Sequence, residues 1–229
     1  MEQLIPFDQA LESLKDKGQC KLLVVSNAKK SFALFKTEAK QLSIDLSTSL
    51  SASCEVEVLY RDSGEFQFEI QFGEDVLIFN LHDDVFDFDR SHALWKTSYV
   101  KENRNNAFCC MISMFSFLRS SLETNRFDDL GYMIGRILVN HENHFFVEGN
   151  KQLGFLYNDL ASSGFTTIKM REVLLTSLNY CLQFALLLPE YEQFTTINVA
   201  QINEISRTMR SHSSKPLGFL LQKGKTPEK

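Results

Sequence analysis

Hydrophobic and polar residues alternate through residues 65–72, and this pattern is the clearest structural signal in the sequence. The odd positions are Glu or Gln, and the even positions are all apolar: Phe66, Phe68, Ile70 and Phe72. A period of two is typical of a strand that buries one face and exposes the other. Apolar runs at 55–60 and 76–81 flank this strand, and Gly-containing turn sequences separate the three. The pattern predicts a three-stranded antiparallel meander.

Elsewhere the apolar residues recur every three or four positions, which predicts helices. The expected helices span 6–16 (ending at Gly18), 32–50, 103–122, 168–188 (ending before Pro189) and 198–210. The run 21–26 has no clear type. A second pair of strands is predicted at 130–139 and 144–148, around a turn at 140–143.

Together these elements predict an α+β fold, in which an antiparallel sheet is covered by helices on one face. The sheet would combine the three-strand meander with the two-strand hairpin. We expect Phe66, Phe68, Ile70 and Phe72 to face the helix at 103–122, and Glu65, Gln67, Glu69 and Gln71 to face water. Residues 1–210 are expected to form a single domain, and 211–229 a basic, mostly flexible tail.

Two resemblances accompany this pattern. The order of elements over residues 32–188 resembles that of type III secretion chaperones and YbjN-like domains, which implies a protein-binding domain without an active site. The segments GEDVLIFNLHDDVFDFD, HALWKTSYV and GRILVNHENHFFVEG are similar to an uncharacterised protein family of Bacteroidetes bacteria. This second resemblance covers most of the chain and implies no particular activity or site residue.

Composition narrows the class of protein. The chain has 229 residues, of which 44% are hydrophobic and 23% charged, as in ordinary globular proteins. A net charge of −5 argues against a general DNA-coating role, which needs a basic face. The first residues lack the basic start of a signal peptide, and no apolar stretch is long enough for a membrane span. Five cysteines without disulfide or zinc spacing indicate the reducing cytoplasm.

Charge is distributed unevenly along the chain. Residues 54–90 contain eleven acidic side chains and two arginines, a net charge of −9, whereas residues 207–229 carry a net charge of +5. Such polarity suits contact with an oppositely charged segment or partner, although a solvated face explains the acidic part equally well.

The segment 82–90 concentrates four carboxylates, and these are the weak candidates for a metal site: Asp83, Asp84, Asp87 and Asp89. They would supply oxygen ligands for Mg²⁺ or Ca²⁺ if the segment curled into a loop, which makes a metal-dependent hydrolase our third hypothesis. The alternation with Phe86 and Phe88 favours an edge strand whose charges discourage aggregation. We therefore expect no metal and no cofactor.

Aromatic and basic residues interleave at 95–104, and the candidate binding residues there are Trp95, Lys96, Tyr99, Lys101 and Arg104. Stacking combined with phosphate neutralisation is how proteins hold single-stranded nucleic acid. The one Trp of the chain could equally serve as an ordinary core anchor.

Enzyme motifs such as GxSxG, the P-loop, GxGxxG and HExxH are absent from the sequence. The first hypothesis is therefore a non-enzymatic, cytoplasmic protein-interaction protein of adaptor or chaperone-like type. Its partner would be another protein or a second copy of the chain. The alternative is a nucleic-acid-binding or processing protein that uses the Trp95–Arg104 patch.

Overall fold

A computed structural model describes residues 7–50, 54–161, 164–183, 198–200 and 203. The expected tail at 211–229 lies outside the described residues, as do most of the expected helix at 198–210 and the last part of the helix at 168–188. None of the helices in these ranges combines the length and the apolar composition that a membrane crossing requires.

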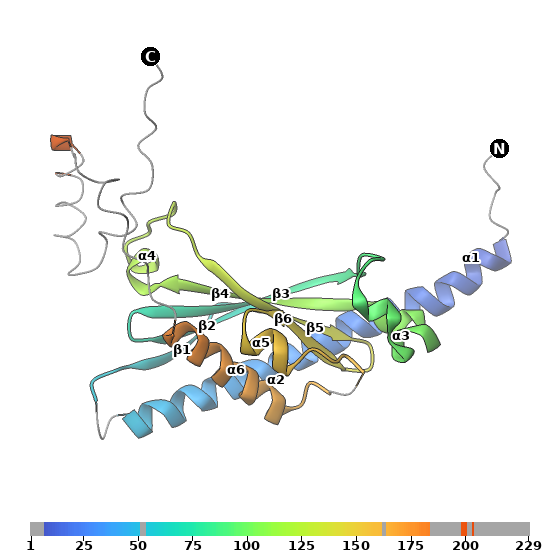
Figure 1. Cartoon of the computed structure of the whole chain (residues 1–229), viewed down its shortest axis with the longest axis horizontal. Helices are drawn as coiled ribbons and strands as arrows, with labels where there is room; N and C mark the ends of the chain where they lie inside the picture. The colour runs from blue at the N-terminus through green and yellow to red at the C-terminus, as the bar shows by residue number, and fades with distance from the viewer. Residues whose placement is uncertain (1–6, 51–53, 162–163, 184–197, 201–202, 204–229) are drawn as a thin grey trace, which may run out of the picture.

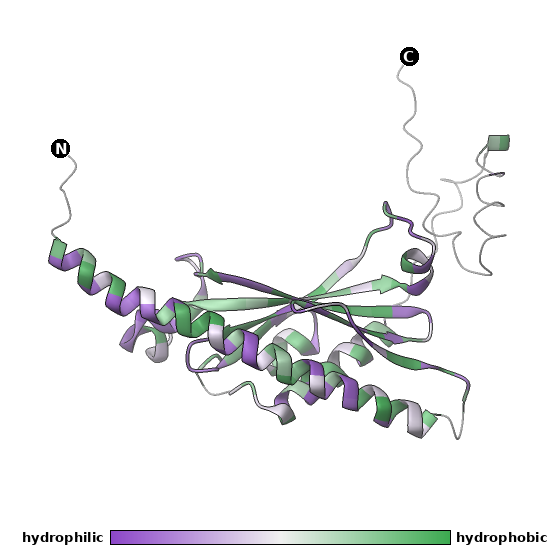
Figure 2. Cartoon of the chain, turned by 180° about the vertical axis from the view of Figure 1, so that it is seen from behind, coloured by the Kyte–Doolittle hydropathy of each residue, from purple (hydrophilic) through white to green (hydrophobic). Residues whose placement is uncertain are grey.

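The first described elements form one long continuous helix. It consists of α1 (Phe7–Ser13), a π-helical turn η1 (Leu14–Gly18) and α2 (Gln19–Leu50). The predicted stop at Gly18 is wrong, because Cys20 and Val24 already pack in the core and their burial outweighs the roughly 1 kcal/mol that Gly costs inside a helix. α1 contains no buried residue and projects past the sheet (Figures 1 and 2). Its apolar residues Phe7 and Leu11 are exposed.

Six antiparallel strands form a single sheet in the order β1-β2-β3-β4-β5-β6, so each strand pairs with its neighbours in sequence. The strands are β1 (Val58–Asp62), β2 (Gln67–Phe72), β3 (Asp75–Phe86), β4 (Cys109–Leu118), β5 (Tyr132–Asn140) and β6 (Phe145–Gly149). The predicted α+β class is confirmed, as are the three-strand meander β1–β3 and the hairpin β5–β6.

The predicted helix at 103–122 is wrong. Its residues form a 3₁₀ turn η3 (Arg104–Ala107), the strand β4 and a short helix α4 (Arg119–Glu123). β4 is a central strand with both faces covered, since Cys110 and Ile112 lie in one hydrophobic cluster and Cys109 in another. A strand buried on both faces is apolar at nearly every position, and this hides its period of two.

The main core lies between the inner face of the sheet and the helices α2 and α6 (Thr167–Leu182). The expected burial of Phe68, Ile70 and Phe72 is correct, but these side chains pack in the core beneath α2 and do not face a helix at 103–122. Phe66, the fourth residue of the expected buried set, precedes β2 and is only half-buried. On the opposite face of β2, Glu65 is exposed while Gln67 and Glu69 are half-buried.

Gln71 departs from the expected exposure of the odd positions, because it is buried on the outer face of the sheet. The strand register places it between Leu59 of β1 and Val76 of β3. Val76 is buried too, so this part of the outer face is not simply a water-facing surface.

A second, smaller hydrophobic cluster covers part of the outer face. The connection between β3 and β4 crosses that face with three short helical turns, which are η2 (Ala93–Lys96), α3 (Ser98–Glu102) and η3. Leu94 and Val100 of this connection pack with Leu138 of β5 and Phe146 of β6. A further short helix, α5 (Gln152–Leu156), follows β6. The connection carries the candidate site.

Candidate anion-binding pocket

Three capping residues shape the connection between β3 and β4. His92, Thr97 and Asn103 each precede one short helical turn and accept a hydrogen bond from a backbone N–H two or three residues later. Such caps satisfy N–H groups that a helix leaves unpaired. Together with the burial of Leu94 and Val100, they give the connection a defined shape.

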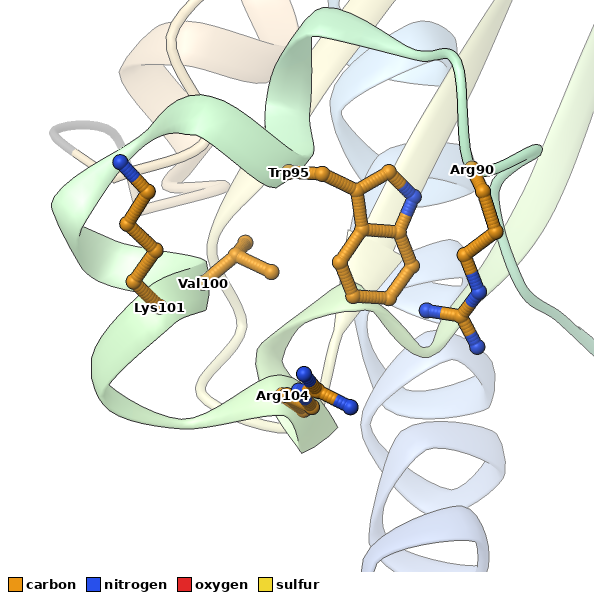
Figure 3. A pocket seen from close by; sticks show the side chains of 5 residues that line it. All are labelled: Arg90, Trp95, Val100, Lys101 and Arg104. Carbon is orange, nitrogen blue, oxygen red and sulfur yellow. The ribbon is translucent and has the colours of Figure 1, made fainter.

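A cavity of about 440 Å³ opens in this connection, lined by Arg90, Trp95, Val100, Lys101 and Arg104 (Figure 3). Three of its five lining residues are cations, one is the only Trp of the chain, and none is acidic. Three of the candidate binding residues from the sequence, Trp95, Lys101 and Arg104, therefore lie around one cavity.

Trp95 is half-buried and held at both its edge and its face. The indole Nε1 donates a hydrogen bond to the backbone carbonyl of Asp89 at 3.0 Å, and the Arg90 guanidinium carbon lies 4.1 Å from the ring centroid. Arg90 also forms an exposed ion pair with Asp87 at 3.3 Å. The indole is therefore oriented before any ligand arrives.

Lys101 and Arg104 provide the uncommitted positive charge of the pocket. Both residues are exposed, and neither side chain forms an ion pair or hydrogen bond within the described part of the chain. A cation without a carboxylate partner is free to pair with an anionic ligand, and the guanidinium group of Arg matches the geometry of phosphate oxygens.

Tyr99 and Lys96 do not line the pocket. The Tyr99 hydroxyl donates to the carboxylate of Glu142 and accepts from Asn140 Nδ2 at 2.8 Å. Burial, followed by the nearby Glu142, raises the pKa of Tyr99 well above its usual value. Tyr99 thus fastens α3 to the turn between β5 and β6, whereas Lys96 is exposed outside the cavity.

Arg90 is the pocket residue that the sequence reasoning did not include. In the sequence it is the last residue of the acidic segment, and its position there suggests an ion pair with a nearby Asp and not a place in the pocket. The turn at residues 89–92, which Asp89 stabilises by accepting hydrogen bonds from both the backbone and the hydroxyl of Ser91, brings it back over the indole. The only indication in the sequence that Arg90 belongs to the pocket was a cation five positions before the Trp.

The four candidate metal ligands are dispersed. Asp83 pairs with Lys29 at 3.5 Å and Asp87 with Arg90, while Asp89 accepts its bonds from Ser91, which hold the pKa of that carboxyl below its usual range. Asp84 is exposed. Among the described residues, no three His, Cys, Asp or Glu side chains lie together as a metal would require. The arrangement gives a metal-dependent hydrolase no support.

The expected edge strand at 82–90 is correct for its first part. Residues 82–86 belong to β3, where they continue past the last β2 pair, Gln67 with Asn80, and pair with β4 alone, so one edge of this end of β3 is open. Residues 87–90 lie beyond the end of the strand. The register of β3 against β4 shifts between His82 and Phe86, so this end of the strand bends before the connection begins.

No protein-family model, curated protein or solved structure matches this chain. The resemblances to type III secretion chaperones and to the Bacteroidetes family stay predictions.

Proposed function

We propose that the protein is a non-enzymatic binding protein whose basic pocket holds a nucleotide unit of single-stranded nucleic acid. The supporting observation is the 440 Å³ cavity that combines an oriented indole with three cations and no lining carboxylate. An unpaired base stacks on an aromatic ring or on a guanidinium plane, so here it would stack on the Arg90 guanidinium that covers the indole or take its place, and cations neutralise the adjoining phosphates.

The size and composition of the cavity favour this ligand over duplex DNA. Small-molecule sites range from roughly 300 to 1,000 Å³, which suits one nucleotide rather than a helical groove. The overall charge of −5 limits the number of phosphate contacts outside the pocket. We therefore expect a shallow salt dependence, with a slope of about −1.4 for contacts of Lys101 and Arg104 with a single strand.

Binding is favoured over catalysis by the side chains that the cavity presents. Its lining includes no His, Asp, Glu, Cys or Ser, the residue types that carry most general acid–base and nucleophilic chemistry. Arg, Lys and Trp supply charge and stacking instead.

Because Trp95 is the only Trp, its intrinsic fluorescence reports directly on the pocket. A short oligothymidylate should quench this fluorescence, and the same strand in a duplex should bind far more weakly. Arg104→Ala and Lys101→Ala should each weaken binding and reduce the salt slope by about 0.7. Lys40→Ala, which removes an exposed cation of α2 outside the pocket, is the matched control.

Two results would overturn the proposal. One is the absence of binding at low salt by a protein that is folded by circular dichroism. The other is an equal loss of affinity in Lys40→Ala and Arg104→Ala, because this would indicate a diffuse charge effect rather than a site.

A protein-interaction role of adaptor or chaperone-like type is the second candidate, and the strongly exposed Phe127 favours it.

For location we propose the cytoplasm. The support is that all five cysteines are free thiols, four of them buried, as expected for a protein in a reducing compartment.

A further inference from the structure

The loop between α4 and β5 has a defined shape although it lies at the surface. Arg126 and Asp129 form an ion pair at 2.8 Å, with side chains only 11% and 12% exposed. The hydroxyl of Ser121 donates to Asp129, and Arg126 in turn donates to that hydroxyl at 3.0 Å. A largely buried ion pair joined to a hydroxyl holds the loop in one conformation.

This loop presents Phe127 to solvent. The residue is 91% exposed, more than any other large hydrophobic side chain among the described residues. A loop that is already held in one conformation loses little further backbone entropy on binding, which favours an aromatic residue on it as an anchor of a protein interface.

A small cavity lies at the same end of the sheet. Its volume is about 110 Å³, and its lining includes Tyr132 and Met133 of β5 together with Tyr180 and Cys181 of α6. Figure 1 shows the loop after α4 and the last turns of α6 at this end. Since an apolar cavity of about 150 Å³ holds benzene, this one has the size to take part of a phenyl ring.

The charges beside the ring and the cavity are opposite. Asp128 follows Phe127 and is exposed, and Lys151 lies beside the cavity with its Nζ 5.7 Å from the Tyr180 ring. In the part of the chain that the structure describes, neither side chain forms an ion pair. A surface that carries Phe127-Asp128 therefore offers an apolar ring and a negative charge to a surface that carries the cavity and the positive charge of Lys151.

We propose that a second copy of this chain covers this end of the sheet. Phe127 of each copy enters the cavity of the other, and Asp128 of each pairs with Lys151 of the other. Because one subunit carries both complementary features, a two-fold axis satisfies both at once and closes the assembly as a dimer. This inference concerns a surface separate from the basic pocket.

Size-exclusion chromatography with light scattering on the full chain tests the proposal. The wild-type protein should be a dimer, and Phe127→Ala should raise its dissociation constant by about 30-fold or more, as expected for a central aromatic anchor. Phe7→Ala, which truncates another exposed Phe in α1, is the matched control and should leave the dimer intact. Far-UV circular dichroism spectra like that of the wild type would show that the variants fold, whatever loss of melting temperature follows from dissociation.

Charge exchange provides the sharper test. Asp128→Lys and Lys151→Asp should each dissociate the dimer, and the double variant should restore it, because the pair is re-formed with reversed charge. A monomeric wild type, a dimer that is indifferent to Phe127→Ala, failure of the double variant to restore association, or open-ended growth beyond a dimer would each overturn the proposal. Capture of a different protein by a monomeric wild type would point to a foreign partner instead.

Discussion

Phe68→Ala is the most direct test of the core. The Phe68 side chain is fully buried in β2, at the centre of an aromatic cluster. Its ring stacks on Phe79 with a centroid distance of 4.6 Å and contacts Phe32 and Phe35 of α2 at 5.4 Å each. Removing this ring takes away three of the aromatic contacts in the core, two of which join the sheet to α2.

The expected cost follows from these contacts. Truncation of a buried Phe to Ala costs roughly 3–5 kcal/mol, because apolar contact is lost and a cavity remains. Each aromatic pair adds about 0.5–1.5 kcal/mol beyond the burial of area. We therefore expect a loss near the top of the range, about 5 kcal/mol, which is a large part of a typical stability of about 5–15 kcal/mol.

Urea unfolding followed by far-UV circular dichroism measures this loss. The adjacent Glu69→Ala is the matched control, since Glu69 lies on the outer face, in an ion pair with Arg61 at 3.5 Å, and accepts a hydrogen bond from Ser63. The loss of these contacts should cost about 1 kcal/mol. The two neighbouring residues of β2 thus provide one core position, Phe68, and one position on the outer face, Glu69.

Similar small losses at both positions would refute the packing described for β2. If Phe68→Ala fails to fold, the milder Phe68→Leu keeps the reasoning testable, because a change of shape in the core should cost about 1–3 kcal/mol. A Phe68→Leu variant as stable as the wild type would contradict a tightly packed aromatic cluster.

The remaining predictions concern ionisable groups. Burial raises the pKa of Cys110 to about 12, whereas Cys54 is exposed, so a thiol reagent at mildly alkaline pH should modify Cys54 rapidly and the four buried thiols only on unfolding. Rapid reaction of more than one thiol in the native protein would contradict this. Burial, together with Asp62, raises the pKa of Tyr60 from 10.0 to about 12. The native state then holds the hydroxyl proton of Tyr60 more tightly than the unfolded chain does. The contribution of this group to the free energy of unfolding is therefore complete below pH 10 and is lost as the pH rises to about 12. Denaturation measured over this interval should be less pH-dependent in Tyr60→Phe, and identical profiles would refute the assignment.

The period-two pattern at 65–72 was sufficient to place β2, the flanking segments and turns placed β1 and β3, and apolar spacing over 32–50 was sufficient to place the body of α2. Both elements have one covered and one more open face, so burial leaves a periodic trace in the sequence. β4 has no such trace, because α2 and the β3–β4 connection cover its two faces, and this is why its residues read as a helix. The helix end predicted at Gly18 was wrong for a related reason, since contacts of Cys20 and Val24 with residues distant in the sequence keep the chain helical there.

The residues of the candidate pocket were likewise predicted only in part from the sequence. Trp95, Lys101 and Arg104 could be found from the sequence because they lie within ten residues of each other. Arg90 and Tyr99 could not be assigned correctly, since the first reaches the indole only through a turn and the second is captured by Glu142 and Asn140, about forty residues away.

Sequence alone therefore determined the α+β class, most strand positions and the chemical character of the patch, because these depend on local periodicity and on residue type. The tertiary structure decided the six-strand order, the placement of the β3–β4 connection on the outer face and the joining of Phe127 and the small cavity at one end of the sheet. These features rest on contacts between segments distant in the chain, and such contacts leave no periodic signal in any one of them.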